Sequence, residues 1–94
     1  MSDLLDESEI EAALKKHPDW ELEGNTIRRT IEFEEYMEGI DFVNDLAEIA
    51  EEAQHHPDVE IQYTKITLTL TTHDAGGLTD ADLEMAQRID NLVD

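Results

Sequence analysis

The sequence has no cysteine, and it contains only 6 lysine and arginine residues against 25 aspartate and glutamate residues. The absence of cysteine excludes disulfide bonds and thiolate chemistry. So few cations cannot form the basic patch that contacts nucleic-acid phosphates or an anionic membrane. No apolar run approaches the roughly 20 residues that cross a membrane, and the acidic first residues do not resemble the basic start of a signal peptide. We therefore expect a cytoplasmic protein with no nucleic-acid or membrane partner.

The excess of acidic residues gives a formal net charge of −19. Such a chain repels itself when it folds in dilute buffer, whereas 1 M salt shortens the Debye length to about 3 Å and screens most of that repulsion. We hypothesise that this is an acidic halophilic protein. The scarcity of lysine favours this reading over the alternative, an ordinary acidic protein.

The length of 94 residues leaves room for one domain, which we place at residues 1–94. Hydrophobic residues make up 39% of the chain and occur in periodic patches, which argues against disorder. A chain this short buries a modest fraction of its surface. We therefore expect it to associate with copies of itself.

The first predicted elements are a helix and a hairpin. Ser8 can cap the helix, with Glu11 completing a capping box, and the helix is expected to end at His17 because a proline follows. Apolar and acidic residues then alternate on either side of Gly24 and Asn25. This alternation is typical of a β-hairpin whose turn holds these two residues.

A second helix is predicted from Glu35 to about Gln54, where the hydrophobic period changes to that of a helix. Its apolar sector is wide enough to cover a sheet and also to meet another subunit. Gly39 inside the helix is a predicted weak point, costing about 1 kcal/mol relative to alanine.

A second hairpin and a last helix complete the chain. Residues 59–72 are rich in β-branched side chains that alternate with polar ones, and we expect a turn near Thr64 and Lys65. Thr79 followed by Asp82 resembles a second capping box. The resulting order, α-β-β-α-β-β-α, predicts an α+β fold with a four-stranded antiparallel sheet and three helices on one face.

Three histidines stand close to the ends of the second hairpin. His55 and His56 lie between the second helix and a strand, and His73 follows the next strand. Because the start of one hairpin strand lies beside the end of the other, the topology predicts that the three imidazoles converge. His73 has the parity of the polar face of its strand, and imidazoles, which titrate near pH 6.5, suit proton transfer.

Other uses of these residues remain open at this point. A histidine pair at a helix end is favoured by the helix dipole alone, and a histidine after a strand is often a simple loop residue. A metal site of His55, His56, His73 and a carboxylate is possible in principle. Adjacent histidines seldom point at one ion, however, so we expect no metal. Trp20 is either a core anchor or a flat wall for a bicyclic ring.

A longer pattern connects these residues: Glu51-x-x-x-His55-His56-Pro57, then Tyr63, His73 and Asp82. It resembles the signature of the pterin-4a-carbinolamine dehydratases, and the surrounding residues are similar to those of bacterial and archaeal members. The resemblance spans nearly the whole chain, including Trp20. Val59 departs from it, because some relatives carry an aromatic residue there. That difference changes the pocket wall and removes no proton-transfer group.

The resemblance implies a lyase that converts a 4a-hydroxytetrahydropterin, such as 4a-hydroxytetrahydrobiopterin, to the quinonoid dihydropterin and water, without metal or organic cofactor. By position, His55 and His73 would form the acid/base pair, and His56 would mainly hold the pterin. Glu51 and Asp82 would orient imidazoles, or else serve as helix-face and capping residues. The same carry-over places Pro57 and Trp20 among the substrate-binding residues. Because animal members of the family form dimers and tetramers, the resemblance also implies a homodimer or homotetramer.

Two other functions are compatible with the sequence. One is a dehydratase-like binding or assembly protein that has lost the activity, which the three intact histidines argue against. The other is a pterin enzyme of molybdopterin metabolism, because nothing in the sequence identifies the residues that meet the pterin side chain.

The charge hypothesis predicts that the melting temperature rises between dilute buffer and molar KCl, because salt screens the repulsion among the acidic side chains. Thermal unfolding followed by circular dichroism in the two solutions measures this. Equal melting temperatures would refute adaptation to salt.

Overall fold

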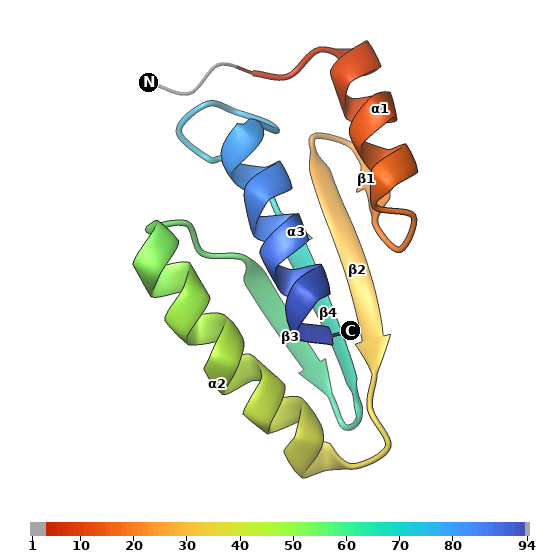
Figure 1. Ribbon diagram of the computed structural model, residues 1–94, viewed down its shortest axis with the longest axis vertical. Coiled ribbons are helices and arrows are strands. Elements are labelled where there is room, and N and C mark those ends of the chain that lie inside the picture. The colour runs from red at the N-terminus through yellow and green to blue at the C-terminus, as the bar shows by residue number, and fades with distance from the viewer. Residues whose placement is uncertain (1–3, 94) are drawn as a thin grey trace.

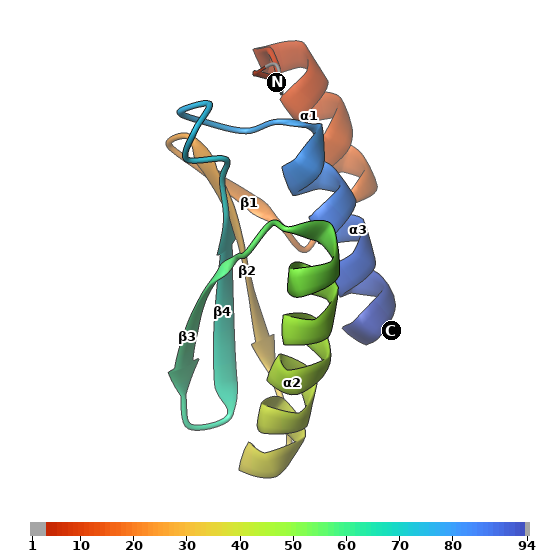
Figure 2. The same ribbon diagram turned by 90° about the vertical axis from the view of Figure 1, so that its left-hand side faces the viewer.

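The computed structural model describes residues 4–93 and has the predicted order of elements. They are α1 (Glu7–Lys16), β1 (Glu21–Glu23), β2 (Thr26–Glu32), α2 (Tyr36–Ala53), β3 (Asp58–Gln62), β4 (Lys65–Leu70) and α3 (Asp80–Val93). The three helices lie on one face of the sheet, and the other face carries none of them (Figure 2). The predicted α+β fold is confirmed.

The sheet is antiparallel throughout, with the strand order β1-β2-β4-β3. The two hairpins therefore meet in the middle, where β2 pairs with β4, and β3 forms an outer edge. Ile66, Leu68 and Leu70 of β4 point toward the helices and are completely buried. They pack against Phe42 and Leu46 of α2 within the main hydrophobic cluster. Alternating apolar residues in the central strands thus create the floor of the core.

The N-cap of α1 lies two residues before the expected one. Asp6, rather than Ser8, is the N-cap: its carboxylate accepts a hydrogen bond from the Glu9 backbone, and the Glu9 side chain accepts one from the Asp6 backbone. The hydrogen bond from the Glu9 N–H, with a second from the Ser8 hydroxyl, lowers the pKa of Asp6 below its usual value. The Ser8–Glu11 capping box was wrong because an acidic cap with the same spacing lies just upstream, and the helix dipole favours a negative charge there.

The second hairpin turns at Tyr63 and Thr64, one residue before the predicted position, and Tyr63 adopts a left-handed conformation with φ of 53°. Gly39, the predicted weak point of α2, lies where the helix meets the sheet. A Cβ atom at this position would lie 2.9 Å from Cδ1 of the buried Ile66. Helix α2 therefore approaches the sheet closely at Gly39, which has no side chain to collide with Ile66. The cost of this approach is the low helix propensity of glycine.

A half-buried carboxylate near the end of α3 connects distant parts of the fold. Asp90 accepts hydrogen bonds from the indole N–H of Trp20 at 2.8 Å and from the Arg29 guanidinium at 2.5 Å, and it lies 3.0 Å from Nδ1 of His17. These partners come from the end of α1, the start of β1 and the middle of β2. The Asp90 cluster therefore fastens α1 and the first hairpin to α3.

The Asp90 cluster generates a stability prediction. Asp90→Ala leaves the largely buried Arg29 without its main partner and the Trp20 indole N–H without an acceptor. We expect the free energy of unfolding to fall by about 3 kcal/mol, as for removal of one partner of a buried ion pair. Denaturant unfolding in molar KCl measures it.

A matched control uses Arg28, the residue before Arg29, whose ion pair with Glu23 is exposed. Glu23→Ala is expected to change the free energy of unfolding by less than about 1 kcal/mol. Equal effects of the two substitutions would show that the Asp90 cluster does not anchor the fold.

Candidate functional site

The three histidines named from the sequence line one pocket of about 250 Å³. The end of α2, the start of β3 and the loop from β4 to α3 lie toward the same end of the molecule (Figure 1). The pocket lies between them, and its lining residues are Gln54, His55, His56, Thr71, Thr72, His73 and Asp74. The predicted convergence of His55, His56 and His73 is thus confirmed.

The end of α2 directs the first two histidines. Gln54 adopts a left-handed conformation with φ of 54°, and its N–H bonds to the carbonyl of Glu51. The N–H of His55 reaches back to the carbonyl of Ala50 at 3.1 Å. This pair of bonds is a Schellman motif, which satisfies the last carbonyls and turns the chain away from the helix axis. His55 and His56 leave the helix at that turn.

The strand register brings the third histidine to them. Asp58 of β3 is paired with Thr69 of β4. Because the strands are antiparallel, extending this register by two residues places His56 opposite Thr71. His73 follows two residues later and is exposed, in agreement with its predicted place on the polar side.

Asp82 stands behind His55 and is completely buried. One carboxylate oxygen, Oδ1, lies 2.5 Å from Nε2 of His55. The other, Oδ2, accepts from the Thr72 hydroxyl at 2.8 Å and from the Thr79 N–H at 2.9 Å. The predicted capping bond from Thr79 N–H to Asp82 is therefore present. The two uses foreseen for Asp82, orienting an imidazole and capping α3, occur together.

These bonds also fix the proton positions of His55. A carboxylate is only an acceptor, so Nε2 of His55 must carry the hydrogen that points to Asp82. The neutral ring then has its lone pair at Nδ1. His55 is half-buried, with 15% of its side chain exposed. The arrangement provides one imidazole with a fixed orientation and a free acceptor nitrogen.

His56 is held more loosely. Its Nε2 lies 2.5 Å from a carboxylate oxygen of Glu51, but the two side chains are 55% and 74% exposed. Glu51 is not among the residues that line the pocket, and it contacts one of them, His56. An exposed pair of this kind contributes little to stability.

An apolar pocket adjoins the histidine pocket. It measures about 150 Å³ and shares His56 with it. Its other lining residues come from α2 and the start of β3: Val43, Leu46, Ala47, Ala50, Pro57 and Val59. Pro57, named as a substrate-binding residue from the sequence, therefore belongs to the apolar neighbour rather than to the pocket with three imidazoles.

Trp20 lies apart from both pockets. Only 3% of it is exposed, and its indole N–H is used by Asp90. This placement corrects the expectation that Trp20 meets the substrate and agrees with the alternative use, a core anchor. The tryptophan is buried because it is the largest apolar side chain at the entrance to the first hairpin and has an acceptor within reach.

Sequence reasoning missed Thr72. It also missed the hydrogen bond of 2.8 Å between the hydroxyls of Thr79 and Thr72, which takes the place of a cap on α3 by the Thr79 hydroxyl. A signal for Thr72 existed, because it has the parity of Leu68 and Leu70, which point into the core. A polar side chain at an inward position needs a hydrogen-bond partner, and here the partner is Asp82.

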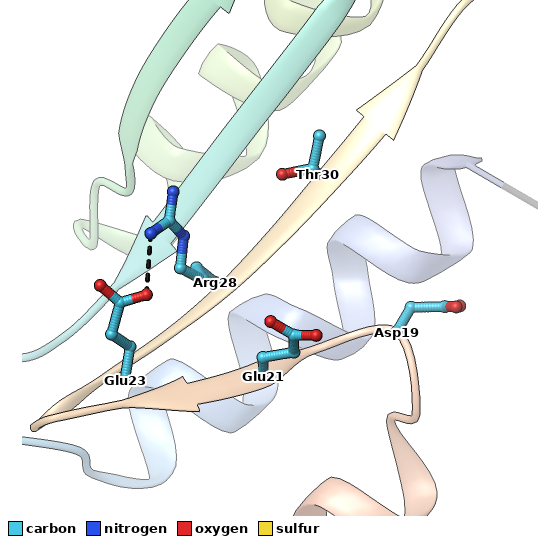
Figure 3. Close-up of a pocket in the computed structure, with 5 residues that line it drawn as sticks. All are labelled: Asp19, Glu21, Glu23, Arg28 and Thr30. Atoms are coloured by element: carbon cyan, nitrogen blue, oxygen red, sulfur yellow. Dashed lines mark hydrogen bonds and ion pairs between the residues drawn. The ribbon is translucent and has the colours of Figure 1, made fainter.

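A larger pocket, about 300 Å³, lies on the helix-free face of the sheet. Figure 3 shows its residues, three carboxylates with Arg28 and Thr30, and the ion pair that joins Arg28 to Glu23. Glu23 raises the pKa of Arg28 above its usual value. The pocket has no imidazole.

Across residues 4–93, no three histidine, aspartate or glutamate side chains are grouped to hold a metal ion, and no helix is long and apolar enough to cross a membrane.

The family model described as pterin 4 alpha carbinolamine dehydratase matches residues 3–92. A protein of Picosynechococcus, provisionally named a pterin-4-alpha-carbinolamine dehydratase, is 50% identical over 92 residues, which cover 98% of this chain and 100% of that protein. A protein of Sulfurisphaera tokodaii with the same provisional name is 47% identical over 89 residues, covering 95% and 96% of the two chains.

Two solved structures resemble the fold. The transcriptional coactivator/pterin dehydratase of Brucella melitensis superposes with a TM-score of 0.93 at 30% identity, over 98% of this chain and 100% of that one. A pterin dehydratase-like protein identified as a RuBisCO assembly factor in the alpha-carboxysome superposes with a TM-score of 0.64 at 24% identity, over 78% and 84%. At that identity, the second likeness concerns the fold alone.

Proposed function

The chain belongs to the pterin 4 alpha carbinolamine dehydratase family, and from this premise we propose that it dehydrates a 4a-hydroxytetrahydropterin to the quinonoid dihydropterin and water. The observation that carries the proposal is the pocket with three imidazoles, one of them bonded to a buried carboxylate. Imidazoles exchange protons near neutral pH, and a histidine held in one orientation is suited to accept a proton from a defined position.

The reaction requires two proton transfers and no oxidant. The bond between C4a and the hydroxyl oxygen breaks, and the hydroxyl leaves as water after it gains a proton. The proton on N5 is removed, and its electron pair forms the double bond between N5 and C4a. Atoms and electrons balance without an electron acceptor, so acid and base groups suffice for the chemistry. We accordingly propose that no metal or organic cofactor takes part.

His55 and His73 fit the two roles. The bond from His55 to Asp82 leaves Nδ1 as the acceptor, and Asp82 can stabilise the imidazolium that forms when Nδ1 takes the N5 proton. His73 comes from the opposite segment and is open to solvent, from which it can be reprotonated after each turnover. We assign His55 as base and His73 as acid, with His56 and Glu51 holding the pterin.

The alternatives make different predictions. A protein that only binds or assembles partners would not accelerate the reaction, although the fold is shared with a protein identified as a RuBisCO assembly factor. A pterin enzyme of molybdopterin metabolism would act on another pterin. The kinetic experiment below therefore tests the activity and its location together.

We expect the protein to accelerate dehydration of freshly generated 4a-hydroxytetrahydrobiopterin over the spontaneous reaction, followed by ultraviolet absorbance in molar KCl. His55→Ala and His73→Ala should each lower kcat/KM by about 10²- to 10⁴-fold, because each removes one general acid or base. Retention of full activity by either variant would contradict its assigned role.

The fourth histidine provides a matched control. His17 contacts Asp90 outside the pocket, and His17→Asn keeps a side-chain nitrogen near the position of Nδ1. This variant should keep the wild-type rate. Folded wild-type protein that gives no acceleration would refute the dehydratase proposal for this substrate.

We also propose that the chain forms a homodimer or homotetramer through the surface of α2 and β3. β3 is an edge strand, and Val59, Ile61 and Tyr63 on or beside it are 39%, 41% and 76% exposed. An exposed edge with apolar side chains tends to pair with another chain. The apolar pocket between α2 and β3 extends the same surface.

Ile61→Lys is expected to reduce the association state, because it places a charge on the apolar surface. Sedimentation velocity in molar KCl over a range of protein concentrations measures this. Gln62→Lys is the control, since it adds the same charge on the other side of the strand, and it should sediment like wild type. A wild-type monomer at every concentration would contradict self-association.

A further inference from the structure

We propose that Thr72 is a positioning residue for the histidine pocket. It acts on both sides of the pocket, the side of His55 and the side of His73. Its side chain holds the Asp82 carboxylate behind His55, and its backbone holds the loop that carries His73. The kinetic part of the inference rests on the proposed dehydratase function, whereas its spectroscopic part does not.

The hydroxyl of Thr72 lies at the centre of a directed chain of hydrogen bonds. It has one hydrogen, which it donates to Oδ2 of Asp82 at 2.8 Å. Its contact with the Thr79 hydroxyl, also 2.8 Å, must then run the other way, with Thr79 as donor. Each hydroxyl hydrogen has one acceptor, and this direction holds as long as Asp82 is a carboxylate.

The chain of bonds restrains the orientation of Asp82. The last torsion of an aspartate side chain has a broad energy profile, so a carboxylate needs contacts to keep one oxygen directed at a partner. Oδ2 is held by Thr72 and by the Thr79 N–H, which leaves Oδ1 directed at Nε2 of His55. Loss of the Thr72 donor leaves a single bond on Oδ2, and the carboxylate can then turn.

The backbone of Thr72 acts on the other side of the pocket. Its carbonyl accepts hydrogen bonds from the N–H groups of Ala75 at 3.0 Å and Gly76 at 2.9 Å, and its N–H donates to the Gly77 carbonyl at 2.9 Å. These bonds close a tight loop directly around His73, which is helped by the left-handed conformation of Gly76, with φ of 79°. Thr72 is therefore bonded to the supports of both His55 and His73.

The substitution that tests the side chain is Thr72→Val, which keeps the branched shape and every backbone bond and removes only the hydroxyl. We expect kcat to fall by about tenfold or more, the loss that accompanies removal of one hydrogen bond to a charged group, with little change in KM. Thr72→Ser keeps the hydroxyl and should restore most of the rate. Thr69→Val, in β4 three residues before Thr72 and outside the pocket lining, should have the wild-type rate.

A spectroscopic readout separates positioning from general stability. In protein labelled with ¹⁵N-histidine, wild type and Thr72→Ser should show His55 as the Nε2–H tautomer. Thr72→Val should show a mixture of tautomers or a broadened signal. A His55 spectrum and a kcat that both equal wild type in folded Thr72→Val would overturn the proposal.

Two further outcomes are decisive. If wild type has no dehydratase activity, the proposed function fails on its own, and the His55 spectrum of Thr72→Val still decides whether Thr72 positions the imidazole. If Thr72→Val does not fold, the wild-type protein supplies the test. Its Thr72 hydroxyl proton should exchange slowly with water, and rapid exchange would overturn the hydrogen-bond chain.

Discussion

A buried carboxylate must be surrounded by hydrogen-bond donors, because an uncompensated charge in the interior costs several kcal/mol. Asp82 meets this requirement with donors from three segments: His55 beyond α2, Thr72 beyond β4 and Thr79 at the start of α3. None of these segments can move away without leaving a buried polar group unpaired. The position of the histidine pocket therefore follows from the burial of one charge.

The three imidazoles of the pocket differ in how firmly they are held. His55 is bonded to a buried carboxylate, His56 to an exposed one, and His73 stands on a loop open to solvent. A fixed imidazole and a solvated one suit different parts of a proton-transfer cycle, because one must be oriented and the other must exchange with water. This asymmetry supports the proposed assignment of His55 as base and His73 as acid.

Helix α3 carries both carboxylates on which the fold depends. Asp82 supports the histidine pocket, and Asp90 holds α1 and the first hairpin through Trp20 and Arg29. Between them, Met85 and Ile89 fill the core. In a chain with a formal net charge of −19, most acidic side chains lie at the surface and repel one another. These two are different, because each is neutralised by specific donors inside the fold.

Element order, strand alternation and the convergence of the histidines were predictable, because periodicity and turn residues act over a few neighbouring positions. Details that depend on packing were not. Gly39 proved to be a point of close contact with Ile66. The alignment of Thr72 with Asp82 depends on how α3 docks against the end of β4. Such contacts join residues from separate elements, so they exist only once the core has packed and no local pattern encodes them.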